Sequence, residues 1–242
     1  MLVIGHRGSP CEGLENSFDS FYKAVEAQCD IIEIDLWGGK DHSLWLCHDE
    51  DLTRTTNSSH VITKLTREEL KKIKLKNKEP LPELKKVLDI FLPQVQINIE
   101  LKDLREEISM ALIKELSLVP LSSKVIISCF NKKPLELIER EAPNLQLAFL
   151  WENDLPPNSE VFNYLEKHPK WFFHPQANTL KAEDLKDFQQ HKRTVYPWVP
   201  RFGVEGDDKE KLWKTMEDFK VHGLCTNYPR EFKQWLKRRK KI

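Results

Sequence analysis

The sequence predicts a (β/α)8 barrel, and three observations lead to this fold class. Short apolar runs alternate with amphipathic helical segments along the chain, which favours a mostly parallel sheet. Apart from Leu44–His48, eight such runs resemble strands, and eight βα units in 242 residues fit the size of this barrel. Histidine, acidic and basic side chains stand near the ends of several predicted strands, where a barrel has its active site.

A doubly wound open sheet is the alternative architecture for repeated βα units. No G-x-G-x-x-G and no G-x-x-x-x-G-K follows a predicted strand, so the usual phosphate-binding loops of that architecture are missing. We therefore expect a barrel that forms a single domain over residues 1–242. The polar, lysine-rich stretch within residues 40–81 is expected to form a small excursion over the C-terminal face of the barrel.

The elements can be placed in chain order from apolar periodicity and turn residues. The first helix is expected to follow an N-cap at Asn16, because apolar residues then recur at helical spacing. Pro82 is expected in the first turn of a helix that ends at Leu92, since proline is tolerated there. Strands are expected at Leu2–Gly5, Ile31–Leu36, Leu44–His48, Val95–Lys102, Lys124–Cys129, Leu145–Leu150, Trp171–His174, Thr194–Trp198 and His222–Thr226. Further helices are expected at Arg67–Ile73, Leu104–Leu118, Leu135–Ala142, Ser159–His168, Leu180–Gln190, Asp207–Lys220 and Arg230–Lys241.

Two of the predicted strands have a polar face and an apolar face. Glu33 and Asp35 lie two residues apart, so their side chains share one face at a spacing of about 6.6 Å along the strand. Strict alternation places Glu100 and Lys102 together on the polar face of the next barrel strand. Buried acids are costly unless they are paired or bind a cation, so the first pair is a candidate half-shell for a hard cation. From that strand alone, a solvated acidic face explains the pair equally well.

The composition and charge favour a cytoplasmic globular protein. Hydrophobic residues make up 40% and charged residues 31%, which is ordinary for such a protein. Lys+Arg and Asp+Glu both number 38, so the net charge gives no reason to expect a nucleic-acid partner. The five cysteines are scattered without a C-x-x-C, which favours free thiols in a reducing compartment.

We expect neither a secretory signal nor a transmembrane segment. The N-terminus has no basic region followed by a long apolar stretch, and no apolar run approaches the ~18 residues of a spanning helix. The basic run Lys237–Lys241 is interpreted as a solvated helix end, with contact to an anionic membrane surface as a minor alternative.

A series of short motifs resembles the glycerophosphodiester phosphodiesterase family. Each motif alone is weakly specific, but they occur in the family's order over nearly the whole chain. The motifs are His6-Arg7-Gly8, Glu15-Asn16-Ser17, Glu33-Ile34-Asp35, His48-Asp49 with Leu52, Arg54, Thr55 and Thr56, Leu81-Pro82-Glu83-Leu84, Glu100-Leu101-Lys102, Ser128, Trp198 and Gly223–Pro229.

The resemblance implies a TIM-type barrel that hydrolyses glycerophosphodiesters to glycerol 3-phosphate and an alcohol with the help of a divalent cation. It also implies roles for nine residues, by match to the family's motifs. Glu33, Asp35 and Glu100 match metal ligands, His6 and His48 match the two catalytic histidines, Arg7 and Lys102 match basic groups that face the phosphate, Glu15 matches an acid lining the same pocket, and Trp198 matches a position in the seventh strand where it either packs or contacts substrate.

The chemistry of these residue types agrees with that implication. Histidine has an unperturbed pKa of roughly 6.5, so it suits both proton donation to the leaving oxygen and activation of the attacking oxygen. Arginine, lysine and a cation can stabilise the charge on the phosphoryl oxygens. Carboxylates without thiolate or imidazole partners favour Mg²⁺ or Ca²⁺ over zinc. The sequence leaves open which histidine is the acid.

The sequence departs from the family pattern at four places, and we expect none of them to touch the histidines or the metal-ligand acids. The departures concern the alcohol side of the site, so the preferred substrate stays open. They are Gln28-Cys29-Asp30 in place of a Gly-Ala-Asp-like turn, Val199-Pro200-Arg201 after Trp198 in place of Thr-Val-Asn, His222 in place of Asp, and Asn227 where Asp is common.

Other functions remain open for the same residues. A lysophospholipase D-type enzyme would use the same groups together with an apolar channel for an acyl chain. An inactive barrel would bind a phosphodiester or a partner without cleavage. A Cys47–His48 nucleophile pair is disfavoured because adjacent strand residues point to opposite faces, and Ser128 lacks a G-x-S-x-G elbow. Glu100 and Lys102 have the simpler explanation of a surface ion pair, and Glu15 that of a helix cap.

Overall fold

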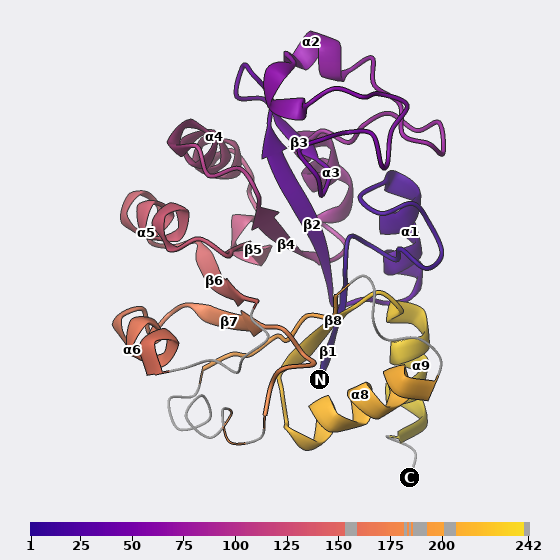
Figure 1. Ribbon diagram of the computed structural model, residues 1–242, viewed down its shortest axis with the longest axis vertical. Coiled ribbons are helices and arrows are strands. Elements are labelled where there is room, and N and C mark those ends of the chain that lie inside the picture. Colours follow the sequence, from indigo (N-terminus) through magenta and orange to yellow (C-terminus); the bar gives the residue numbers. More distant parts are fainter. Residues whose placement is uncertain (153–158, 182, 184, 186–192, 201–206, 240–242) are drawn as a thin grey trace.

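The computed structural model describes the chain except for residues 153–158, 182, 184, 186–192, 201–206 and 240–242, and its parallel strands curl into a barrel surrounded by helices (Figure 1). The strand order is β7-β6-β5-β4-β2-β1-β8, and every neighbouring pair in this order is parallel. The strands are β1 (Leu2–Gly5), β2 (Ile31–Gly38), β3 (Leu44–Leu46), β4 (Gln96–Leu101), β5 (Val125–Cys129), β6 (Gln146–Trp151), β7 (Phe172–Pro175) and β8 (Gly223–Thr226). The α-helices are α1 (Phe18–Glu26), α2 (Arg67–Leu70), α3 (Leu84–Phe91), α4 (Glu106–Ser117), α5 (Lys132–Glu141), α6 (Ser159–Lys167), α8 (Asp207–Asp218) and α9 (Pro229–Arg239), and short 3-10 helices lie at Ile62–Lys64 and Ser122–Lys124.

The segment around residues 194–198 closes the barrel between β7 and β8. Val195 forms a parallel bridge with Phe173, and Trp198 forms parallel bridges with both Gln176 and Cys225. The predicted seventh strand is therefore present in position, although it pairs through isolated bridges rather than a continuous ladder. The (β/α)8 fold class is confirmed.

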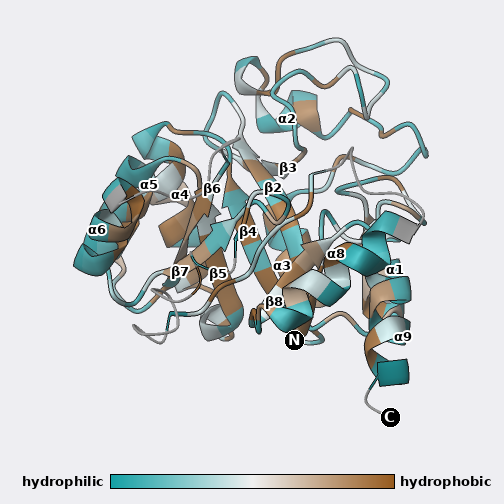
Figure 2. Cartoon of the chain, turned by 60° about the horizontal axis from the view of Figure 1, so that its bottom comes forward, coloured by the Kyte–Doolittle hydropathy of each residue, from teal (hydrophilic) through white to brown (hydrophobic). Residues whose placement is uncertain are grey.

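Two layers of apolar side chains stabilise the barrel. The larger layer lies between the sheet and the helices, and Figure 2 shows hydrophobic residues on the strands and on the helix faces turned toward them. The smaller layer fills the interior of the barrel. Its buried members come from six strands or their edges and include Ile4, Ile31, Ile126, Ala148, Tyr196 and Cys225. This inner layer forms an apolar floor beneath the polar side chains at the strand ends.

The predicted excursion is present and has a hydrophobic cluster of its own. Strand β2 extends to Gly38, and its end pairs with β3 in antiparallel register, with Trp37 opposite Trp45. Beyond this hairpin, residues 51–81 carry α2 and lie at the end of β2 and β3 (Figure 1). The buried members of the cluster are Trp45, Cys47, Leu52, Ile62, Leu70, Leu75 and Leu81.

The excursion also contacts the first helix of the barrel. The carboxylate of Glu79 accepts hydrogen bonds from the backbone N–H groups of Phe18 at 2.9 Å and Asp19 at 3.2 Å. These donors lie in the first turn of α1, where backbone N–H groups lack partners within the helix. The negative charge also complements the helix dipole. Glu79 thus attaches the excursion to α1.

Two predicted helix starts are wrong. Ser17, and not Asn16, is the N-cap of α1, and its side chain accepts a hydrogen bond from the Ser20 N–H. Asn16 instead has a positive φ of 50° and points its side chain at Asp35. Helix α3 begins at Leu84, so Pro82 precedes it and its carbonyl accepts a hydrogen bond from Leu46.

Three further predictions concern the helix at Leu180–Gln190, the cysteines and transmembrane helices. Most of the helix predicted at Leu180–Gln190 lies outside the described residues. All five cysteines have free thiols, as the sequence predicted. In the described part of the chain, no helix combines the length and the apolar character that are needed to cross a membrane.

Candidate active site

A cavity of about 460 Å³ opens at the carboxyl ends of the barrel strands. One half of its wall is charged and comes from the loops or ends of β1, β2, β3 and β4. The other half is mainly apolar and comes from β5, β6, β7, the 194–200 segment and β8. The lining residues include His6, Arg7, Glu33, His48, Asp49, Arg54, Asn98, Glu100 and Lys102 in the charged half, and Phe130, Leu150, Tyr196, Trp198 and Pro200 in the apolar half.

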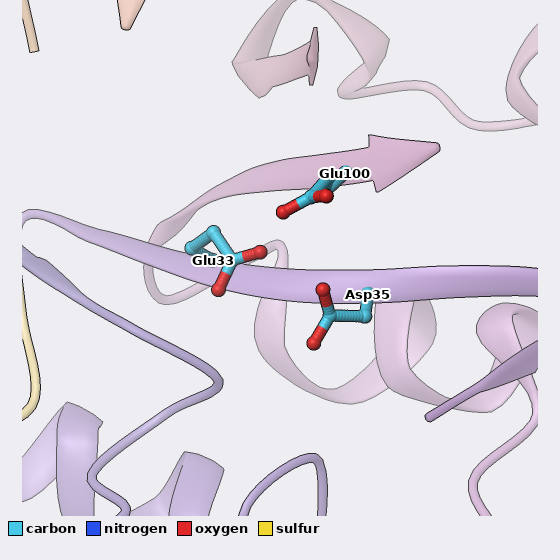
Figure 3. Close-up of side chains that lie close together, drawn as sticks. All are labelled: Glu33, Asp35 and Glu100. Atoms are coloured by element: carbon cyan, nitrogen blue, oxygen red, sulfur yellow. The ribbon is translucent and has the colours of Figure 1, made fainter. Parts of the chain in front are cut away.

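Three buried carboxylates converge at the charged side (Figure 3). Glu33 and Asp35 come from β2 and Glu100 comes from β4, and one oxygen of each lies within 4.8 Å of the others. The register explains this convergence, because Asp35 is directly opposite Glu100 in the parallel β2–β4 pair. The predicted grouping of these acids from two strands is therefore found. Such a cluster could hold a metal ion.

Burial and mutual repulsion control the ionisation of these acids. Burial, followed by the charges of Asp35 and Glu100, raises the pKa of Glu33 well above its usual value. Burial also raises the pKa of Glu100, to about 7. For Asp35, burial acts in the same direction, but Arg7 and Lys102 outweigh it and lower the pKa to about 2. Negative charge in this cluster is therefore incompletely compensated, which favours the binding of a cation.

Two basic side chains lie against the acids. Lys102 places its Nζ 2.6 Å from Glu100 Oε1 and 3.6 Å from Asp35 Oδ1. Arg7 places its Nε 3.1 Å from Asp35 Oδ2, and its backbone N–H donates to Glu33 at 2.8 Å. Arg7 has a positive φ of 53°, an unfavourable conformation for a residue with a side chain. This conformation is held by contacts on both its backbone and its guanidinium.

His6 follows β1 and is buried at the edge of the cavity, with 5% of its surface exposed. Its Nδ1 lies 2.8 Å from the side-chain oxygen of Asn227, which accepts and never donates. The proton of a neutral ring is therefore on Nδ1, and Nε2 keeps a free electron pair. Burial and then the charge of Arg7 lower the pKa of His6 to about 3, so the ring is neutral at neutral pH. One of the four departures from the family pattern does contact a histidine, and the expectation that none would do so is wrong at Asn227.

His48 follows β3 on the other side of the acids. Its Nδ1 lies 2.6 Å from Asp49 Oδ1, so this histidine has a carboxylate where His6 has an amide. Burial, together with the charges of Arg7 and Lys102, lowers the pKa of His48. The charge of Asp35 and the hydrogen bond that the ring donates to Asp49 oppose that shift without cancelling it. A carboxylate partner fixes the tautomer of a histidine and stabilises its protonated form.

Glu15 was predicted to line the pocket, but it lies behind the cavity wall. Its side chain is 1% exposed, and its Oε1 lies 3.0 Å from Arg7 Nη1 and 2.6 Å from Arg54 Nη2. Asn16 lies next to it, donates from Nδ2 to Asp35 at 2.7 Å and accepts from the Asp35 N–H at 3.2 Å. The Glu15-Asn16 motif therefore holds cavity residues in place and does not itself form the wall.

Trp198 lies in the apolar half of the cavity, on the segment that was predicted as the seventh strand. Its ring meets Phe130 edge to face with the ring centroids 5.8 Å apart, and its Nε1 donates to the Trp151 carbonyl at 3.3 Å. Phe130 remains 38% exposed. Trp198 therefore both packs and contributes cavity surface, so the two alternatives drawn from the sequence are not exclusive.

Comparison of the sequence with known proteins links this site to one protein family. The sequence model of the glycerophosphoryl diester phosphodiesterase family matches residues 6–231. The chain belongs to this family. A glycerophosphodiester phosphodiesterase of Caldanaerobacter subterraneus subsp. tengcongensis is 29% identical over 239 residues, which cover 94% of each chain. A lysophospholipase D of Rattus norvegicus is 25% identical over 276 residues, covering 96% of this chain and 85% of the relative.

Solved structures of phosphodiesterases share the fold. A phosphodiesterase from Oleispira antarctica, solved in complex with the product sn-glycerol-3-phosphate, aligns with a TM-score of 0.86 at 21% identity and covers 98% of this chain and 97% of its own. The enzyme from Thermotoga maritima aligns with a TM-score of 0.79 at 23% identity and covers 97% and 98%.

Several cavity residues of this family member were not predicted from the sequence as site residues. Asp49 and Arg54 stand within a motif that was recognised, and Asn98 lies on the polar face of a predicted strand, so a signal existed for these three. Ser128 also stands among the recognised motif residues, whereas His174 gave no signal of a site because it looks like one polar residue in an apolar run. Ser128 Oγ and His174 Nε2 are buried and find no hydrogen-bond partner among the described residues.

Proposed function

We propose that the protein acts as one domain that hydrolyses glycerophosphodiesters to glycerol 3-phosphate and an alcohol, with a bound divalent cation. The observation that carries this proposal is a cluster of three buried carboxylates, two of which, Glu33 and Glu100, line the same cavity as His6 and His48. Family membership supports it, and so do the relatives named as glycerophosphodiester phosphodiesterases. The product named in the Oleispira antarctica complex is the one proposed here.

The cation is assigned to Glu33, Asp35 and Glu100, whose chemistry fits it. All three offer carboxylate oxygens, and Glu33 Oε1 has no hydrogen-bond partner within the described part of the chain. An all-oxygen set suits Mg²⁺ or Ca²⁺ better than zinc. When bound, such an ion supplies positive charge that polarises a phosphoryl oxygen.

One histidine is proposed to accept a proton and the other to donate one, and their hydrogen-bond partners indicate which residue has which role. We assign His6 as the general base because Nε2 carries a free electron pair and burial keeps the ring neutral. We assign His48 as the general acid because the carboxylate of Asp49 stabilises its protonated form. His6 would take the proton from the attacking oxygen, and His48 would give one to the leaving alcohol oxygen.

Arg7 and Lys102 are assigned to the phosphoryl oxygens. Both line the cavity and lie beside the acids, so an anionic phosphate would meet positive charge on that side. Arginine offers a planar fork of donors, whereas lysine acts as a point charge. Glu15 is assigned a supporting role, since its carboxylate holds the guanidinium of Arg7.

A lysophospholipase D-type activity is the second candidate. The apolar half of the cavity, with Phe130, Leu150 and Trp198, offers a surface for an aliphatic group. The rat relative named as a lysophospholipase D supports this option.

The free thiols favour a reducing compartment, for which we propose the cytoplasm.

Release of glycerol 3-phosphate tests the proposed function. The protein is incubated with glycerophosphocholine, glycerophosphoethanolamine or lysophosphatidylcholine, with Mg²⁺ or Ca²⁺, and water-soluble and lipid products are quantified. We expect release of glycerol 3-phosphate, with a loss of roughly 1,000-fold or more in His6→Ala and His48→Ala. Preferential cleavage of lysophosphatidylcholine would favour the second candidate. Equal product from wild type and both variants would contradict the enzymatic proposal and leave an inactive, phosphodiester-binding barrel.

A further inference from the structure

The excursion reaches the cavity through Arg54, which lies on a rigid turn. Leu52 is completely buried in the hydrophobic cluster of the excursion. The Leu52 carbonyl accepts hydrogen bonds from the Thr56 N–H at 3.0 Å and from Thr56 Oγ1 at 2.7 Å. The backbone on both sides of Arg54 is therefore fixed, so the motif Leu52–Thr56 forms a firm base for this side chain.

The guanidinium of Arg54 joins two carboxylates from separate parts of the chain. Its Nε lies 2.5 Å from Oδ2 of Asp49, in the segment after β3. Its Nη2 lies 2.6 Å from Oε1 of Glu15, in the segment after β1. Arg54 itself is 35% exposed at the side chain, whereas Glu15 is 1% exposed. A planar guanidinium can meet two carboxylates at once, and a lysine ammonium on a flexible stem cannot fix that geometry.

Each of these carboxylates holds a group with a role in the proposed reaction. Asp49 uses its second oxygen, Oδ1, on Nδ1 of His48 at 2.6 Å. Glu15 also contacts Nη1 of Arg7 at 3.0 Å, and Arg7 in turn contacts Asp35 at 3.1 Å. The ion pairs thus run without interruption from His48 through Arg54 to the acid cluster.

We propose that Arg54 is a positioning residue that orients the proton-transferring His48 through Asp49 and the phosphate-facing Arg7 through Glu15. This inference rests on the proposed function. It gives a role to a motif residue that the reaction itself does not use, and it explains why the excursion contributes to the site. Misplacement of a catalytic group by about 1 Å can cost about 100-fold in rate. We call the paired contacts of Arg54 with Asp49 and Glu15 the clamp. Its loss is therefore expected to reduce turnover even though the barrel stays intact.

Three variants of the 242-residue chain test the clamp with Mg²⁺ present. Arg54→Met removes the charge and keeps much of the aliphatic stem, and Arg54→Lys keeps the charge but removes the planar fork. Arg67→Met is the matched control, because Arg67 lies in the same excursion and pairs with Glu83 away from the cavity. We expect kcat/KM for glycerophosphocholine to fall about 10- to 100-fold in both Arg54 variants and to stay within about 2-fold in Arg67→Met.

A second readout separates positioning from a merely structural role. The ring protons of His48 are followed by NMR as a function of pH in wild type, Arg54→Met, Asp49→Asn and the double variant. The charged groups that act on His48 are Asp49, Asp35, Arg7 and Lys102. In wild type, the positive charge of Arg54 offsets part of the negative charge of Asp49. Without Arg54 this offset is lost, so the His48 pKa is expected to rise. In the Asp49→Asn background, removal of Arg54 is expected to raise that pKa by a smaller amount, because only the direct repulsion between Arg54 and His48 is then lost.

The two readouts also separate this inference from the proposed function. If wild type releases no glycerol 3-phosphate, the proposed function fails, while the NMR series still tests the clamp. An unchanged His48 pKa in Arg54→Met would overturn the clamp, and so would an equal rise in the Asp49→Asn background. Loss of kcat/KM in Arg67→Met as large as in Arg54→Met would assign the effect to general weakening of the excursion.

Discussion

At the scale of single residues, we expect Glu33 to favour cation binding at a cost to the folding stability of the metal-free protein. One of its oxygens accepts from the Arg7 backbone N–H, and the other lacks a hydrogen bond from any described residue. We predict that Glu33→Gln stabilises the metal-free protein by on the order of 1–2 kcal/mol, because it removes a poorly compensated buried charge. The same change should weaken Mg²⁺ or Ca²⁺ binding about 10-fold or more. Denaturant titration and calorimetry measure the two effects.

The control for this prediction is Asp103→Asn. Asp103 is also a buried acid near the end of β4, but Arg105 and the Gly38 N–H satisfy it. The substitution should therefore cost about 1–3 kcal/mol of stability and leave cation affinity unchanged. Loss of stability in Glu33→Gln, or normal cation affinity, would contradict the assignment of Glu33 as a ligand.

His174 provides a prediction about pH. It is 4% exposed, and burial lowers its pKa to about 3. Between pH 6.5 and pH 3, the unfolded chain binds a proton at this residue and the folded chain does not, so stability falls as pH falls. We expect His174→Gln to reduce that slope by about 1.4 kcal/mol per pH unit over this range. Urea denaturation at several pH values measures the slope, and an unchanged slope would show that His174 is charged in the folded protein.

The residues that could be predicted from the sequence are those whose placement depends on a strand. Glu33, Asp35 and Glu100 were grouped correctly because alternation fixes their face and parallel pairing brings their strands together. The partners of the histidines were not predictable, because Asn227 and Asp49 meet them only through the folded loops. The prediction that Glu15 lines the cavity was wrong for the same reason. The local sequence does not show which side chains separate its carboxylate from the cavity.

At the scale of elements, the excursion behaves as a small unit attached to the barrel. Its cluster of buried side chains is separate from the main core, and Leu70 of α2 is completely buried in it. We predict that Leu70→Ala costs about 2–4 kcal/mol locally, because it leaves a cavity in the cluster. Hydrogen exchange should then accelerate mainly over residues 51–81. By contrast, Leu112→Ala in α4 removes a main-core side chain and should accelerate exchange across the barrel helices and strands.

The elements themselves were largely predictable, and the errors have identifiable causes. Strand and helix types followed from periodicity, and the barrel followed from their number. The cap of α1 was missed because Asn16 and Ser17 are both good capping residues, and only the tertiary contact of Asn16 with Asp35 decides between them. The attachment of α1 to Glu79 spans about sixty residues, so no local pattern could reveal it.

At the scale of the whole molecule, the proposed cation site joins two neighbouring strands near the centre of the sheet. Strands β2 and β4 pair over six residues, and the cluster draws ligands from both. A cation that binds the folded chain and not the unfolded chain should therefore stabilise the whole barrel. At 100 times the dissociation constant, the expected gain is about 2.7 kcal/mol, or an increase in Tm of roughly 5–10 °C.

Thermal denaturation with and without Mg²⁺ or Ca²⁺ measures this gain, and a chelator should reverse it. The increase should persist in Asp103→Asn, because that acid has satisfied partners outside the cluster, and it should largely vanish in Glu33→Gln. Because the proposed ligands lie on two central strands of the barrel, the shift should appear in both helical and aromatic circular dichroism signals. A shift of equal size in Glu33→Gln would place the cation elsewhere on the molecule.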